Sequence, residues 1–140
     1  MRKSAMLIAI AAVAASIATA ASAQTSNAPS GPAFAKRFFT TALEKDPSRV
    51  VQMQMELYLP NRPGKGFHMH NGDQWEAVIE GEITYTVKGQ PPRVLKVGDS
   101  VYVPRGTIHG NENKSDAPAR TISLYVMDKD KPQTIPVPTD

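Results

Sequence analysis

Short β-type segments, separated by turn residues, follow one another along most of this 140-residue chain, and this succession most restricts its fold. Over residues 51–59, apolar residues such as Val51 and Met53 alternate with polar residues such as Gln52, which is the two-residue period of a strand. No segment after Leu43 has a helical period. Many short strands with such breaks indicate a β-sandwich or β-barrel rather than an α/β fold. The further strands expected are 67–70, 74–79, 83–87, 94–97, 100–103, 107–110 and 120–127.

The segment 36–43 fits either the start of a helix or an additional strand. Asp46-Pro47, which follows it, is a turn signal placed directly ahead of the alternating segment. We therefore expect residues 36–43 to form a strand that leads into a hairpin.

The first 23 residues have the pattern of an export signal. Arg2 and Lys3 precede an almost unbroken apolar run over residues 5–20, and Ala21-Ser22-Ala23 offers the small residues of a cleavage site. A membrane anchor would need about 20 strongly apolar residues, whereas this run is shorter and rich in alanine. We expect a signal peptide over 1–23, cleaved between Ala23 and Gln24. The expected location is the periplasm or the exterior, with no membrane segment after cleavage.

The charge balance after such a cleavage argues against a nucleic-acid partner. The full chain has 16 Lys+Arg and 13 Asp+Glu, a formal net charge of +3. Residues 1–23 contain two basic residues and no acidic one, so 14 basic residues remain against 13 acidic ones. Because no basic run is present either, we expect no nucleic-acid partner.

Length and composition predict one domain. The chain contains no cysteine, so its stability depends on its core, and about 117 residues after cleavage suffice for a single core. Residues 24–33 are small and polar with Pro and Gly, and are expected to form a flexible lead-in. The β-barrel domain is expected over 34–130. The tail 131–140 contains three prolines and is expected to lie extended on the surface.

The three histidines of the chain are spaced as metal ligands would be. His68 and His70 lie two residues apart on an expected strand, so their side chains point to the same face. The Asn71-Gly72-Asp73 turn then leads into the next strand, which Gln74 opens beside them. His109 follows a Pro-Arg-Gly turn much later. Two imidazoles from one strand, a third from a distant strand and an adjacent oxygen donor form a usual donor set for a first-row divalent metal.

Residues 64–113 resemble the two sequence motifs of the cupin family. Gly64 to Gly81 are similar to the first motif, in which a glycine, His-x-His, an acidic residue and a closing glycine follow in order. The resemblance implies an all-β single-domain cupin double-stranded β-helix (a jelly-roll barrel) with one divalent transition metal inside. It also implies a homodimer, because small cupins commonly dimerise. The second motif, G-x5-P-x-G-x2-H-x3-N, is matched at every spacing by Gly98, Pro104, Gly106, His109 and Asn113.

One position departs from the family's pattern, because Gln74 occupies the place of the usual glutamate. The side-chain amide can offer its carbonyl oxygen to a metal but brings no negative charge. With three neutral imidazoles, the metal would keep its full charge, which is expected to weaken binding and to leave a stronger Lewis acid. Alternatively, Gln74 lies outside the ligand shell and water completes it.

Glu76 is the candidate for the missing carboxylate. It lies two residues beyond Gln74 on the same expected strand and therefore shares its face. A carboxylate there is suited to act as a general base, a proton relay or a distant ligand. The alternative is a paired or solvated position at the mouth of the barrel.

The resemblance leaves the reaction open, because cupins include dioxygenases, decarboxylases, isomerases and proteins that only bind. Our first hypothesis is a periplasmic Fe(II) or Mn(II) dioxygenase, an oxidoreductase acting on a small organic molecule. In it, His68, His70 and His109 hold the metal, Gln74 completes the shell and Glu76 moves protons. Zn, Ni or Cu are alternative metals. A non-catalytic module that binds a metal or small ligand is the second hypothesis, and a decarboxylase or isomerase is a further alternative.

Overall fold

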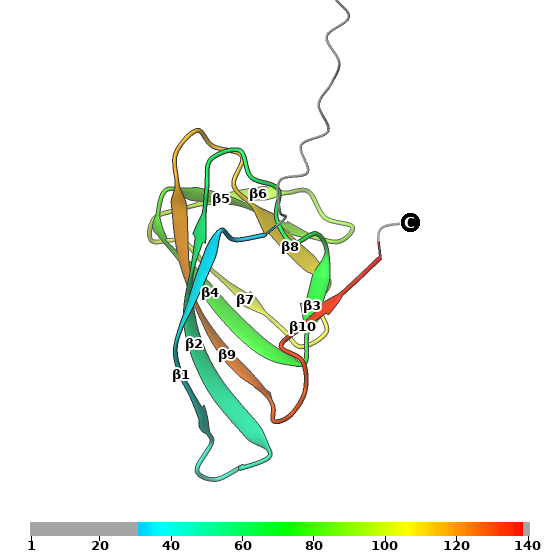
Figure 1. The fold of residues 1–140 in the computed structure, drawn as a ribbon. Coiled ribbons are helices and arrows are strands. Elements are labelled where there is room, and N and C mark those ends of the chain that lie inside the picture. The colour runs from blue at the N-terminus through cyan, green and yellow to red at the C-terminus, as the bar shows by residue number, and fades with distance from the viewer. Residues whose placement is uncertain (1–30, 139–140) are drawn as a thin grey trace, which may run out of the picture.

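The computed structural model describes residues 31–138, which form two antiparallel five-stranded sheets facing each other across a barrel (Figure 1). The expected all-β fold is confirmed. Within residues 31–138 there is no helix with the length and apolarity needed to cross a membrane. The first sheet has, in spatial order, β1 (Phe34–Ala42), β2 (Arg49–Tyr58), β9 (Ala119–Asp128), β4 (Gly72–Glu80) and β7 (Ser100–Val103). The second has β10 (Thr134–Pro136), β3 (His68–His70), β8 (His109–Glu112), β5 (Glu82–Val87) and β6 (Arg93–Lys96).

The strand expected at 36–43 is confirmed as β1, but the expected turn at 71–73 is wrong in part. Gly72 and Asp73 belong to β4, where Gly72 pairs with Met127 of β9. A Cβ at Gly72 would lie 2.1 Å from the Val126 carbonyl oxygen, so glycine permits a close approach of two strands here rather than a turn. The strand expected at 107–110 begins instead at His109, because Thr107 closes a turn by donating its N–H to the Pro104 carbonyl.

The alternation on β2 places its polar residues inside the barrel. Gln52, Gln54 and Glu56 are buried, whereas the outward-facing Met53 and Met55 remain partly exposed. This orientation of β2 is the reverse of the usual one, in which the apolar face of a strand points inward. It follows that part of the barrel interior is polar, and this is the part into which the histidines project.

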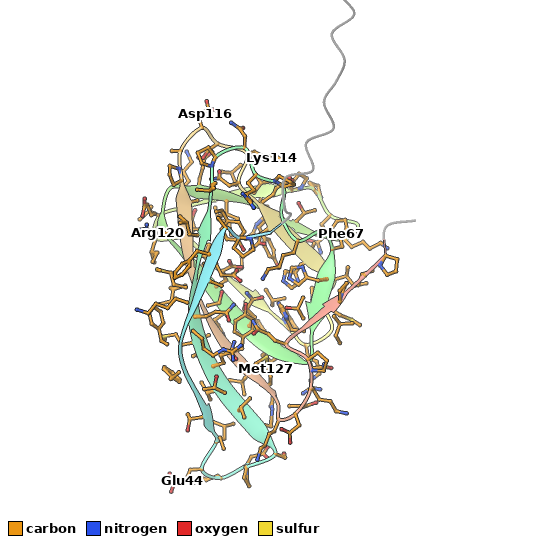
Figure 2. The ribbon with its side chains drawn as sticks, viewed as in Figure 1. Glu44, Phe67, Lys114, Asp116, Arg120 and Met127 are labelled. Carbon is orange, nitrogen blue, oxygen red and sulfur yellow. The ribbon has the colours of Figure 1, made fainter. Side chains whose placement is uncertain are left out.

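The apolar core fills the rest of the interior, with side chains from both sheets between the two layers (Figure 2). The β1–β2 hairpin, with Glu44 at its tip, extends away from this core, and the turn with Lys114 and Asp116 lies at the opposite end of the molecule (Figure 2). The core consists of Tyr58, Val78, Ile83, Tyr85, Leu95, Val101, Val103 and Ala119.

Both ends of the described chain attach to the barrel. Strand β10, within the tail predicted to be extended, pairs with β3 and places Thr134 opposite His70. At the other end, Ala33 donates its N–H to the Leu57 carbonyl. The predicted signal peptide and residues 24–30 of the predicted lead-in lie outside the described residues. The tail therefore adds a strand beside the first two histidines.

Candidate metal centre

His68, His70 and His109 converge inside the barrel, as their spacing predicts. The first two lie on β3, and His109 of β8 is the direct partner of His68 across the antiparallel pair. The three ring centroids are 4.5–5.0 Å apart, and the candidate ligand nitrogens all lie within 4.8 Å of one another. All three residues are buried, with His109 only 1% exposed. This buried triad is suited to bind one metal ion.

Backbone carbonyls set the tautomer of each imidazole. The Nδ1 atoms of the three rings lie 3.0 Å, 2.7 Å and 2.9 Å from carbonyl oxygens, which can only accept. Each Nδ1 must therefore carry the proton, which leaves the Nε2 lone pair free for a metal, the usual arrangement at histidine ligands. The accepting carbonyls belong to Gly66 for His68, Gln133 for His70 and Thr107 for His109.

The environment of the triad keeps the rings neutral. Burial lowers the pKa of His70 and of His109 to about 4 and also lowers the pKa of His68, because desolvation disfavours the charged imidazolium. At neutral pH the rings are therefore unprotonated at Nε2, the form that binds metals. The Nε2 atom of His70 is buried with no hydrogen-bond partner in residues 31–138, which fits a ligand atom.

Gln74 lies on the inner face of β4, and its two amide atoms differ in their contacts. The Nε2 atom donates to the Tyr125 hydroxyl at 3.0 Å and to Ser123 Oγ at 3.2 Å. The Oε1 atom is buried and accepts no hydrogen bond within the described part of the chain. A buried carbonyl oxygen without a donor is costly unless something else satisfies it. A metal ion at the triad would do so, and the donor set of three imidazoles and one amide oxygen fits such an ion.

Glu76 is buried and hydrogen-bonded within the barrel, and it is not solvated. It is 3% exposed, and Asn111 of β8 donates from Nδ2 to its two carboxylate oxygens at 3.1 Å and 3.3 Å. Gln74 also donates to it at 3.4 Å. Burial, reinforced by the negative charge of Glu56, raises the pKa of Glu76 to about 7. A carboxyl group with such a pKa exchanges protons readily near neutrality.

Sequence reasoning missed a second set of polar residues beside the triad. Glu56 of β2 is 3% exposed, and it accepts hydrogen bonds from the Tyr58 hydroxyl at 2.7 Å and from the ammonium of Lys65 at 2.8 Å. Lys65 comes from the segment before β3 and enters the same polar region. Glu56 is one of the polar positions in the alternation over residues 51–59. This alternation would have predicted a buried polar group if the sequence had shown that the polar face of the strand is the inner one.

A hollow of about 430 Å³ lies along β5 and β7, and none of the three histidines is among the described residues that line it. Tyr85, whose ring centroid lies 5.7 Å from that of His109, lines it together with Thr107, whose carbonyl holds the same histidine. Arg93 contributes a positive charge to the wall. The hollow therefore shares Tyr85 and Thr107 with the surroundings of His109.

The sequence profile of the cupin domain matches residues 54–125, just over half of the chain. Over 90 residues the chain is 33% identical to the dimethylsulfoniopropionate lyase DddQ of Ruegeria pomeroyi, covering 64% of this chain and 40% of the lyase. Over 80 residues it is 31% identical to the HTH-type transcriptional regulator PuuR of Escherichia coli, covering 57% of this chain and 43% of the regulator. The chain thus spans less than half the length of these two curated relatives.

A solved structure supports the same fold. An uncharacterized conserved protein with a double-stranded β-helix domain from Klebsiella pneumoniae superposes with a TM-score of 0.56 at 22% identity. The superposition covers 72% of this chain and 81% of that one. The two sheets of the barrel therefore form a double-stranded β-helix. With the profile match over the strands that hold the triad, it follows that this chain belongs to the cupin family.

Proposed function

We propose that this protein is a periplasmic metal-dependent enzyme that transfers a proton to or from a small organic molecule bound beside the triad. The observation that carries the proposal is the position of Glu76. Its carboxyl group is buried on the same strand face as Gln74, is held by Asn111, and has a pKa of about 7. A general acid or base is most effective when its pKa lies near the working pH.

The residues of the centre have distinct roles in this proposal. His68, His70 and His109 hold a divalent metal, Fe(II) or Mn(II) in our first choice and Zn, Ni or Cu in our second, through Nε2. The Oε1 atom of Gln74 faces the same ion. Such a metal supplies Lewis-acid stabilisation of an oxygen that becomes negative as a neighbouring C–H bond breaks.

The reaction class that we favour is elimination. Glu76 accepts a proton from a carbon next to a carbonyl or carboxylate group of the substrate. The electron pair of that C–H bond forms a new C=C bond, and the bond to a leaving group on the adjacent carbon breaks, with the leaving group keeping its electron pair. The similarity to a protein named as a lyase supports this choice.

Proton abstraction is tested by isotope exchange in D2O. The protein, loaded in turn with Fe(II), Mn(II) and Zn(II), is incubated under argon with a panel of small carboxylic acids and ketones, and deuterium at carbon is followed by NMR. We expect metal-dependent exchange or elimination that falls by about 100-fold or more in Glu76→Gln. The exposed Glu80→Gln serves as a matched control and should retain the rate. Equal rates in Glu76→Gln and the unmodified protein would refute the role of Glu76.

The dioxygenase of our first sequence-based hypothesis remains the second candidate. Its supporting observation is the neutral donor set, because three imidazoles and an amide leave the charge of a redox metal uncompensated. An oxygen electrode with a panel of enols, catechols and flavonols separates the two reactions. Metal-dependent O2 uptake would favour oxidation, and turnover under argon would favour elimination.

The similarity to a transcriptional regulator supports a third, non-catalytic candidate. A binding module would show tight stoichiometric binding of a metal or small ligand and thermal stabilisation by it, as mass action requires, without turnover.

A further inference from the structure

Lys65 enters the polar part of the barrel from a segment that has little freedom to lie elsewhere. A Cβ on the preceding Gly64 would lie 1.7 Å from the Asn111 carbonyl oxygen of β8, so only glycine permits this close approach. Gly66, which follows, has a φ of +78°, a conformation that glycine adopts without strain. The Gly64-Lys65-Gly66 segment is thereby pressed against β8, with the lysine side chain directed inward to Glu56.

The ammonium of Lys65 retains donors beyond its ion pair. Its Nζ atom lies 2.8 Å from Glu56 Oε1, and the lysine side chain is 32% exposed. An ammonium group has three N–H donors. Glu56 is the one hydrogen-bond partner of Nζ within residues 31–138. Two donors therefore remain for a ligand or for water.

Glu56 holds this ammonium in place. Its Oε1 atom accepts from Lys65 and from Gln54, and its Oε2 atom accepts from Tyr58. Because these contacts come from two neighbouring side chains of the same strand and from the inserted lysine, the carboxylate is fixed. Lys65 is therefore positioned by the barrel wall.

The segment that carries this ammonium contacts the triad. The carbonyl of Gly66, next to Lys65 in the chain, accepts the Nδ1–H of His68 at 3.0 Å. The positive charge of Lys65 is among the causes that lower the pKa of each of the three histidines. The candidate metal ligands bring no negative charge, so they would not offset the charge of a metal ion, and Lys65 would add the N–H donors that Glu56 leaves free.

We propose that Lys65 binds the carboxylate of the substrate alongside the metal ion, so that the site selects small organic carboxylates over their neutral analogues. This inference rests on the proposed metal centre. Lys65 acts here as a specificity-determining residue: it donates to the anionic group and takes no part in the transfer of protons. A hydrogen bond from a charged donor to a carboxylate is among the stronger polar interactions in proteins.

The test compares propionate with the neutral propionamide. The protein is loaded with Co(II), its metal content is measured by elemental analysis, and each probe is titrated while the visible Co(II) absorption and the heat of binding are recorded. In the unmodified protein we expect propionate to perturb the Co(II) spectrum and to bind about tenfold more tightly than propionamide. Equal binding of the two probes, or no binding of propionate to the loaded protein, would overturn the inference.

Substitutions assign the preference to the lysine. Lys65→Met should weaken propionate binding about tenfold and leave propionamide unchanged, with Co(II) content retained. Lys65→Arg should restore part of the affinity. Lys88→Met removes an exposed lysine from the β5–β6 turn and should behave as the unmodified protein. Lys65→Met/Glu56→Gln removes the whole ion pair and avoids a buried unpaired carboxylate, so it provides the same test if the single variant fails to fold.

The outcomes distinguish the two proposals. If the unmodified protein takes up no Co(II), the metal centre itself is wrong, and the role of Lys65 fails with it. If Co(II) is taken up but Lys65→Met and the double variant bind propionate as the unmodified protein does, only the role of Lys65 is refuted.

Discussion

Gln74 of β4 and Tyr125 of β9 are direct partners across the sheet, and the Gln74 amide nitrogen donates to the Tyr125 hydroxyl at 3.0 Å. This contact fixes the side chain so that its carbonyl oxygen is the atom left without a donor. The glutamine in the place of the family's usual glutamate therefore keeps its carbonyl oxygen without a donor, and its amide nitrogen has hydrogen-bond partners that a carboxylate could not satisfy in the same way.

Gln74→Glu should bind the metal more tightly and fold less stably without it. The added negative charge would offset part of the charge of the ion, and we expect roughly tenfold tighter metal binding in competition with a chelator, about 1.4 kcal/mol. In the metal-free protein the new carboxylate would face Glu76, to which Gln74 now donates at 3.4 Å, and repulsion should lower the melting temperature. Metal competition and thermal denaturation measure the two effects. The exposed Gln90→Glu should show neither, and unchanged retention in Gln74→Glu would place residue 74 outside the ligand shell.

Removing one imidazole should abolish metal-dependent stability. We expect His109→Ala to reduce metal affinity by about 100-fold or more. This exceeds the usual loss when a residue that only hydrogen-bonds to a metal ligand is removed. Thermal denaturation with and without a chelator checks this. The melting temperature of the unmodified protein should fall on chelation and that of His109→Ala should not move. A chelator effect that persists in His109→Ala would point to a metal bound elsewhere.

The metal-free protein should lose stability as the pH falls from about 6.5 to 4. The pKa of His70 and of His109 is about 4 in the folded protein, whereas unfolded histidine titrates near 6.5, so the unfolded chain binds more protons in this window. Within this window, each of these two histidines changes the free energy of unfolding by about 1.4 kcal/mol per pH unit. Chemical denaturation at several pH values measures the slope.

Glu76 should oppose this acid effect. Its pKa of about 7 in the folded protein exceeds the unfolded value, so between about 4.5 and 7 the folded state binds the additional proton. Its contribution to stability is therefore present at low pH and is lost as the pH rises through 7. Glu76→Gln should make the acid loss steeper and raise stability at pH 8 relative to the unmodified protein. A pH profile unaltered by Glu76→Gln would contradict the raised pKa.

The outer face of the first sheet predicts a homodimer. Met53, Leu124, Trp75 and Tyr102 are successive partners across β2, β9, β4 and β7, and form one outward-facing row. Trp75 is 43% exposed and stacks on Tyr102 at 5.1 Å between ring centroids. A second copy could cover this row with its own. Sedimentation analysis should give a dimer that Trp75→Glu converts to a monomer, while Val97→Glu, at an exposed turn, leaves it intact. A monomeric unmodified protein would contradict the prediction.

Export is tested on the full chain expressed in a Gram-negative bacterium. We expect the protein in the periplasmic fraction with Gln24 as its first residue, because cleavage after Ala23 removes residues 1–23. The intact mass of the purified protein shows whether residues 1–23 have been removed. A product in the cytoplasm that retains Arg2 and Lys3 would contradict the predicted signal.

The sequence predicted what depends on local spacing. The alternation along a strand put His68 beside His70 and Gln74 on the face of Glu76, and motif spacing identified His109 as their distant partner. The inner face of β2 could not be predicted in this way, because a two-residue period is the same whichever face is buried. Inside the barrel, Gln54 and Glu56 form hydrogen bonds along β2 and with Lys65, and only the folded structure reveals these contacts.

The remaining parts of the site depend on contacts between distant segments. Lys65 enters the barrel because Gly64 lies against the Asn111 carbonyl, and the Nδ1–H of His70 is accepted by Gln133 from the tail. Neither contact has a local pattern in the sequence. Both lie within reach only after β3 has paired with β8 and β10.

The central claim is that three imidazoles bind one ion. A crystal structure of protein prepared with Mn(II) or Fe(II), with anomalous diffraction recorded at the absorption edge of the metal, tests it most directly. The account predicts one anomalous peak at about 2.0–2.3 Å from the Nε2 atoms of His68, His70 and His109. An ion bound elsewhere, or ε-nitrogens hydrogen-bonded to protein groups with no peak between them, would contradict it.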